Sequence, residues 1–84
     1  MKYKEYKNYF FVGIGGIGMS ALAKYLFQNN KHIYGYDRVQ SKITDQLVKE
    51  GIDISYVFNK SLIELKRLNP KNTLIVYTPA ISHD

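Results

Sequence analysis

The sequence contains no cysteine. A chain without thiols has no disulfide, no thiolate zinc ligand and no thiol nucleophile, which excludes disulfide-stabilised secreted domains and cysteine-dependent enzymes. It also has no apolar run approaching the roughly twenty residues that cross a bilayer. The charged N-terminus is not followed by the apolar segment and small-residue cleavage site of a secretory signal. Together these absences predict a cytoplasmic protein.

Positive charge is present but is not concentrated. The net charge is +5, and the lysines are spread along the chain rather than clustered in the basic patch that nucleic-acid binding needs. The short run Gly15-Gly16-Ile17-Gly18 also resembles the glycine loop of KH domains, but that loop joins two helices, whereas this run follows a strand. We therefore expect no nucleic-acid partner.

The most informative stretch spans residues 13–37. An apolar strand at 9–12 leads directly into Gly13-Ile14-Gly15-Gly16-Ile17-Gly18, and a helical pattern follows. About twenty residues after the last glycine, a second strand ends in Asp37, the acidic position that typically holds a ribose hydroxyl. Strand, glycines, helix, strand and acid in this order predict a nucleoside diphosphate site.

Each glycine has a separate expected task. Gly13 permits the tight turn out of the strand, Gly15 lets a phosphate approach the backbone, and Gly18 lets helix and strand pack closely. The helix start directs unpaired N–H groups at the phosphate, an interaction worth about 1 kcal/mol per favourable charge. Ser20 either adds a hydroxyl donor or acts only as a cap-like residue.

Asp37 distinguishes some ligands but not others. Its carboxylate would accept ribose hydroxyls and would repel a 2′-phosphate unless Arg38 compensates, which disfavours NADP. The alternative is an ordinary turn aspartate. NAD, FAD and a nucleotide sugar all carry ribose and diphosphate, so these residues alone leave the three open.

The rest of the chain alternates helices and strands. A helix is expected at 17–28, with an inner stripe formed by Ala21, Leu22, Tyr25 and Leu26. A second helix is expected to bury Ile43, Leu47 and Val48. Ser41 would cap its start, and Gly51 would end it in the left-handed conformation. Further strands are expected at 32–36, 52–58 and 74–77, with a third helix before Asn69-Pro70. This order predicts one Rossmann-type three-layer α/β domain with a parallel sheet over residues 1–84. The last loop, from Thr78, leaves the fourth strand at the carboxyl end of the sheet, near the glycine loop.

No catalytic constellation is visible. The chain has no Gly-x-x-x-x-Gly-Lys-Ser/Thr loop for ATP phosphates. His32 is placed at a strand start and His83 in the last loop, while the eight tyrosines are explained by packing. These residues predict binding rather than reaction.

A family resemblance narrows the ligand. Residues 11–23, Phe-Val-Gly-Ile-Gly-Gly-Ile-Gly-Met-Ser-Ala-Leu-Ala, closely resemble the start of the bacterial UDP-N-acetylmuramate:L-alanine ligases, Mur ligases of peptidoglycan synthesis. The likeness continues through Gly35-Tyr36-Asp37, then Ser41, Thr44, Leu47 and Gly51, and ends at Thr78-Pro79-Ala80-Ile81, which is similar to the Ser-Ser-Ala-Ile of the family.

The resemblance implies a division of labour among domains. In that family the N-terminal domain holds the UDP part of UDP-N-acetylmuramic acid, a central domain binds ATP and Mg²⁺, and a C-terminal domain helps to bind L-alanine. The enzyme forms an acyl phosphate that the L-alanine amine attacks. We therefore expect residues 1–84 to be the N-terminal UDP-sugar-binding domain of a larger ligase, inactive alone.

The resemblance also assigns site residues. Those implied for the diphosphate are Gly13, Ile14, Gly15, Gly16, Ile17, Gly18, Met19 and Ser20; those for the ribose region are Asp37, Arg38 and Ser41; those closing over the nucleotide are Thr78, Pro79, Ala80 and Ile81. No catalytic residue or metal ligand is expected among them. Two departures matter: Val57-Phe58 stands where the family has Gly-His, so uracil contacts are apolar or come from elsewhere, and Pro79 replaces a serine.

Three other functions stay open. The related ligase that attaches a recycled tripeptide to the same UDP-sugar has similar motifs. An NAD-binding domain of an oxidoreductase or of a potassium-transport regulator is allowed by the glycines and Asp37, although Met19-Ser20 and the loop from Thr78 argue against it. A non-enzymatic ligand-sensing module is the third.

Overall fold

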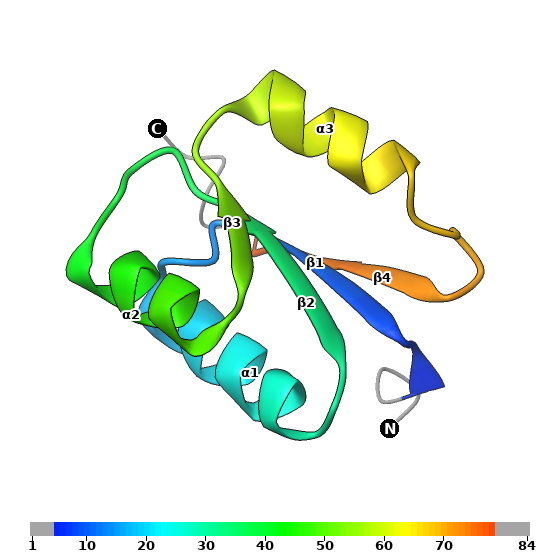
Figure 1. The fold of residues 1–84 in the computed structure, drawn as a ribbon, viewed down its shortest axis with the longest axis horizontal. Coiled ribbons are helices and arrows are strands. Elements are labelled where there is room, and N and C mark those ends of the chain that lie inside the picture. Colours follow the sequence, from blue (N-terminus) through cyan, green and yellow to red (C-terminus); the bar gives the residue numbers. More distant parts are fainter. Residues whose placement is uncertain (1–4, 79–84) are drawn as a thin grey trace.

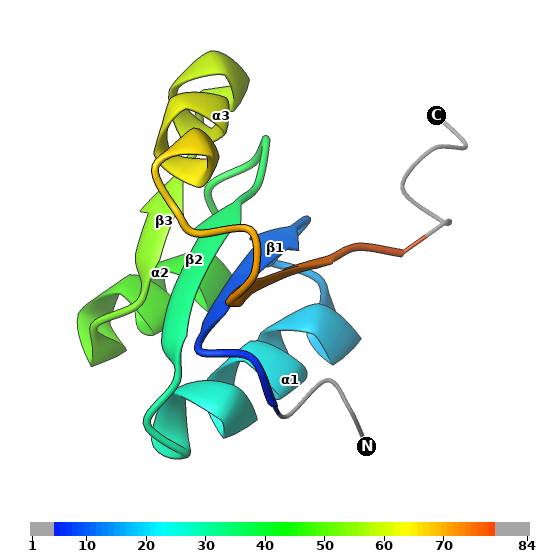
Figure 2. The same ribbon diagram turned by 90° about the vertical axis from the view of Figure 1, so that its right-hand side faces the viewer.

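The computed structural model describes residues 5–78. Its elements are β1 (Asn8–Val12), α1 (Ile17–Gln28), β2 (His32–Tyr36), α2 (Lys42–Glu50), β3 (Asp53–Ser55), α3 (Phe58–Lys66) and β4 (Thr73–Val76). The four strands form one parallel sheet in the order β3-β2-β1-β4. Helices α1 and α2 cover one face of the sheet and α3 lies on the other (Figure 1 and Figure 2). The predicted Rossmann-type three-layer fold is therefore confirmed.

Strand β1 lies at the centre of the core. Its consecutive residues Tyr9, Phe10 and Phe11 are all buried, as expected for a parallel strand that is covered on both faces. β1 pairs with β2 on one side and with β4 on the other. The loop that follows β1 is consequently anchored at the most buried part of the domain.

The expected boundaries of α2 are confirmed. The Ser41 hydroxyl accepts a hydrogen bond from the Thr44 N–H at 3.2 Å, and the Ser41 N–H donates to the Thr44 hydroxyl oxygen at 2.8 Å. This reciprocal capping box satisfies two backbone donors at the helix start. Gly51 ends the helix with a φ of 110°, the left-handed conformation that favours glycine.

Removing this cap gives a measurable prediction. We expect Ser41→Ala to lower the free energy of unfolding by about 1 kcal/mol, because the Thr44 N–H loses its acceptor. Urea denaturation of the 84-residue chain followed by circular dichroism would measure it. Ser20→Ala is the matched control, since Ser20 lies inside α1 and caps nothing; an equal loss in both variants would contradict the assignment.

The inner faces of two helices differ from the prediction. In α1 the buried residues are Ala23 and Leu26, whereas Ala21 and Tyr25 are exposed. Met19, Leu22 and Phe27 complete the inner stripe, which has the i, i+3, i+4 spacing of a helix but is rotated from the expected one. In α2, Leu47 is buried as predicted, but Ile43 and Val48 are 37% and 47% exposed, and Thr44, a member of the capping box, is buried instead.

The third strand is shorter than predicted. β3 ends at Ser55, and residues 56–58 do not continue it. The Ser55 hydroxyl accepts a hydrogen bond from the Val57 N–H at 3.2 Å, a local turn that competes with strand pairing. Phe58 consequently begins α3, and the Ser61 hydroxyl donates to its carbonyl oxygen at 2.7 Å.

Candidate functional site

The glycine loop is tied to the end of β2. The N–H groups of Gly13 and Ile14 both donate to the carbonyl oxygen of Tyr36, at 2.8 and 3.1 Å. Gly13 has a φ of 81°, a conformation that side chains other than glycine rarely adopt. The tight turn predicted at Gly13 is therefore confirmed.

Asp37 lies against this loop. Its Oδ2 accepts the Gly15 N–H at 2.7 Å, and its Oδ1 accepts the Val39 N–H at 3.0 Å. A Cβ at Gly15 would lie 2.8 Å from Asp37 Oδ2 and 3.0 Å from Thr44 Cγ2. Gly15 thus allows the close approach of Asp37 and Thr44; the approach of a phosphate to the same glycine stays a prediction.

Gly18 does not have the packing role expected of it. Apart from its chain neighbours and the backbone of its own helix, a Cβ at Gly18 would meet no atom of the described residues within 4 Å. The close approach is made instead at Gly35, where a Cβ would lie 2.9 Å from both Cβ and Cγ2 of Ile14. The buried Ile14 side chain packs directly over this β2 glycine.

The start of α1 has no side-chain cap. Its N-cap, Gly16, makes no side-chain cap hydrogen bond, and the first turn has no acidic residue. The first N–H groups of a helix have no acceptor within the helix and form the positive end of its dipole. The Ser20 hydroxyl donates to the Ile17 carbonyl oxygen at 3.0 Å, so it lies one turn into the helix and is not its N-cap.

A hollow of about 500 Å³ lies at the carboxyl ends of β1 and β2. Four of the residues predicted for the site border it: Gly13, Gly16, Asp37 and Arg38. Ligands of parallel α/β sheets bind outside the carboxyl ends of the strands. This strand-end hollow is therefore the candidate site.

The other predicted residues occupy different places. Ile14 is fully buried, so its side chain lies in the core. Ile17, Gly18 and Met19 form the first turn of α1, and the Ser41 side chain caps α2. Thr78 is the last described residue, and Pro79, Ala80 and Ile81 lie outside the described residues.

Val12 and Tyr36 border the hollow although neither was expected there. Phe58 borders it as well, at the position where the resemblance left an apolar uracil contact open. The tyrosines had been explained by packing, and Phe58 had been placed in a strand. The signal that could have corrected the second error is Ser55, because a serine hydroxyl three residues before a helix start can end a strand by binding the backbone.

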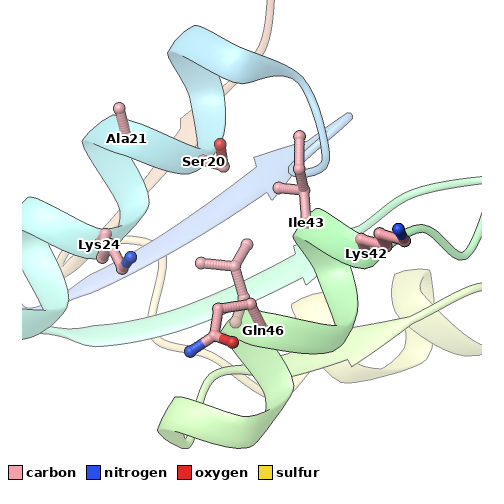
Figure 3. A pocket seen from close by; sticks show the side chains of 7 residues that line it. Ser20, Ala21, Lys24, Lys42, Ile43 and Gln46 are labelled. Carbon is pink, nitrogen blue, oxygen red and sulfur yellow. The ribbon is translucent and has the colours of Figure 1, made fainter.

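A second hollow, of about 410 Å³, lies between α1 and α2. Figure 3 shows Ser20 and Lys24 on α1 facing Gln46 on α2 across it. Beside this second hollow, Lys24 Nζ lies 3.3 Å from Glu50 Oε2. The pKa of Glu50 is lowered, chiefly by the hydrogen bond from Gln46. Burial partly opposes this effect by raising the pKa, and the hydrogen bond and charge of Lys24 lower it further. This carboxylate therefore favours the folded chain above its ordinary pKa, and the effect is lost as pH falls.

Two kinds of feature are not found in residues 5–78. No three histidine, aspartate or glutamate side chains gather into a group that could hold a metal ion. None of the helices in that range is long and apolar enough to span a membrane.

Comparison with known proteins identifies relatives that match most of the chain. A family model described as Mur ligase family, catalytic domain, matches residues 8–84. The UDP-N-acetylmuramate--L-alanine ligase of Porphyromonas gingivalis is 46% identical over 78 residues, 93% of this chain and 17% of that protein. The ligase of the same name from Parabacteroides distasonis is 50% identical over 72 residues, 86% of this chain and 16% of its own length.

A third relative, the UDP-N-acetylmuramate--L-alanine ligase of Flavobacterium johnsoniae, is 43% identical over 81 residues, 96% of this chain and 18% of its length. The chain thus spans less than a fifth of each of these relatives. No solved structure matched the chain. Because the family model covers nearly all of the sequence, the chain belongs to the Mur ligase family.

Proposed function

We propose that this chain binds the UDP part of UDP-N-acetylmuramic acid, as the N-terminal domain of a ligase that adds L-alanine in peptidoglycan biosynthesis. The observation that carries the proposal is the identity of 43–50% with ligases of that name over most of these residues. The uncapped start of α1, beside the strand-end hollow, supports it.

Each part of the site has a role in this proposal. The diphosphate lies against the loop from Gly13 to Ser20, where the positive end of α1 stabilises its charge. Asp37 and Arg38 face the ribose from the same hollow, and the segment from Thr78 to Ile81 closes over the nucleotide. Asp37 holds Gly15 by a hydrogen bond, so it also orients the loop that receives the phosphates.

The chemistry belongs to the larger protein. We propose that ATP and Mg²⁺ bind in the parts of the ligase that this chain does not span, where the muramoyl carboxylate is activated and L-alanine attacks it. The protein acts in the cytoplasm, and the 84 residues bind without catalysing. Two alternatives remain: a ligase that attaches a tripeptide to the same UDP-sugar, and an NAD-binding domain that uses the same glycines and Asp37.

Calorimetric titration of the chain with UDP, UMP and uridine tests the binding proposal. We expect UDP to bind at least about tenfold more tightly than UMP, because the second phosphate gains the helix start. Equal affinities for UDP and UMP would contradict the proposal that the glycine loop binds the diphosphate. In the whole enzyme, ATP-dependent product formation with L-alanine but not with the tripeptide would distinguish the two ligases.

A further inference from the structure

Strand β4 is an edge of the sheet. It pairs with β1 on one side, and no strand of residues 5–78 lies on its other side (Figure 1). Residues 72–78, Asn-Thr-Leu-Ile-Val-Tyr-Thr, include neither a charged residue nor a proline, the residues that usually keep a free edge from pairing. The opposite edge, β3, is only three residues long and begins with Asp53. Among the described strands, β4 is therefore the one that is open to a further strand.

The hydrogen bonds to β1 indicate which backbone groups of β4 point outward. The Asn8 N–H donates to the Asn72 carbonyl oxygen at 2.9 Å, and Asn8 is paired with Thr73 in the parallel register. Successive residues of a strand direct their N–H and C=O groups to opposite sides. Asn72 and Leu74 consequently direct theirs towards β1, whereas Thr73 and Ile75 present theirs to the free edge.

The side chains beside this edge form an apolar strip. Thr73 and Ile75 lie on one face of β4, and Tyr77 continues this spacing of two. Ile75 is 47% exposed and Tyr77 is 68% exposed. Thr73 and Ile75 also border a hollow of about 220 Å³, whose other walls come from the end of α3 and the loop after it: Leu65, Lys66, Leu68 and Pro70. We call this hollow the β4 hollow.

The strip is complementary to a second copy of itself. When two β4 strands pair antiparallel about a two-fold axis at Ile75, Thr73 of one copy lies opposite Tyr77 of the other. Ile75 then exchanges its outward N–H and C=O with Ile75 of the second copy, as hydrogen-bonded pairs of antiparallel strands do. Each Tyr77 comes beside the β4 hollow of the other copy, which Thr73 borders. Because residues 72–78 are uncharged, no like charges meet within the paired strands.

We propose that two copies of this chain associate through β4, antiparallel about Ile75, with the Tyr77 side chain of each copy packed in the β4 hollow of the other. The contact joins the two four-stranded sheets into one continuous sheet. A two-fold contact of this kind is closed, because each copy uses its free β4 edge. It is separate from the strand-end hollow, which Thr73, Ile75 and Tyr77 do not border.

Sedimentation equilibrium of the 84-residue chain tests the association. We expect the average mass to rise from 9.8 kDa towards twice that value as the concentration increases from about 1 μM to about 1 mM, because a small interface binds weakly. Ile75→Lys places two ammonium groups at the axis and should weaken association at least about tenfold. Ile63→Lys is the matched control, because Ile63 is 56% exposed on α3 and does not border the β4 hollow.

The control variant should associate as the unaltered chain does, and circular dichroism would show that both variants are folded. A mass that stays at 9.8 kDa at every concentration would overturn the proposal and leave the edge to a strand of another polypeptide segment. Equal weakening by the two lysine substitutions would overturn it as well, because the effect would then come from added charge and not from its place at β4.

Amide hydrogen exchange of the unaltered chain tests the register. The Leu74 N–H faces β1, so it should be protected at low and at high concentration. The Ile75 N–H points to the free edge, so its exchange should slow at least about tenfold as the dimer forms. Association without slower exchange at Ile75 would place the interface elsewhere and contradict pairing through β4.

Discussion

Gly35→Ala is expected to lower the free energy of unfolding by about 3 kcal/mol, the upper part of the range for overpacking a core. The added methyl group would overlap the side chain of Ile14, which is fully buried. Ile14 also donates its N–H to the Tyr36 carbonyl oxygen. Displacing it would therefore pull the glycine loop from the end of β2.

Thermal unfolding of the variant measures this effect. For a domain of this size a loss of about 3 kcal/mol corresponds to roughly 15 °C in Tm. Gly18→Ala is the control, because its methyl group would meet no described atom outside its own helix turn within 4 Å and alanine favours a helix. A Gly35→Ala variant as stable as Gly18→Ala would show that Ile14 does not pack as described.

Gly15→Ala is expected to lose about 2 kcal/mol of stability and at least about tenfold in UDP affinity. Its methyl group would lie 2.8 Å from Asp37 Oδ2, so the carboxylate would have to leave the Gly15 N–H that it now accepts. Thr44, buried on α2 and 3.0 Å from the same position, leaves little space for adjustment. The loop would then no longer hold the shape that we propose receives the diphosphate.

A double-mutant cycle separates this clash from a general backbone effect. In an Asp37→Ala background the nearest obstacle is gone, so Gly15→Ala should cost at least about 1 kcal/mol less than it does in the unaltered chain. Urea denaturation of the four proteins gives the coupling energy. Additive effects of the two substitutions would mean that Asp37 does not limit the space at Gly15.

Sequence patterns predicted most of the fold because each signal was local. Ser41 and Gly51 carry their capping chemistry in neighbouring residues, and β2 was predicted at its observed bounds. The third strand was extended too far because alternating apolar residues continue past Ser55, whereas a side-chain hydrogen bond within the turn ends the strand. The spacing of apolar residues does not predict a hydrogen bond of this kind.

The site was predicted only in part, because only some of its residues belong to a local sequence motif. Gly13, Gly16, Asp37 and Arg38 belong to a recognisable motif and do border the hollow. The packing task expected of Gly18 belongs to Gly35, because Ile14 folds back onto β2. Phe58 was named with Val57 for an apolar uracil contact but was placed in a strand, because its position depends on how α3 begins. The motif thus did not predict contacts between segments that are distant in the sequence.

The most direct test of the proposed function is an NMR titration of the isotopically labelled chain with UDP-N-acetylmuramic acid and, separately, with NADH, following backbone amide shifts. We expect saturable shifts from Gly15 to Ser20 and at Asp37 and Thr78 with the UDP-sugar alone. A response confined to NADH would contradict the ligase assignment of the site and favour a redox or sensor domain.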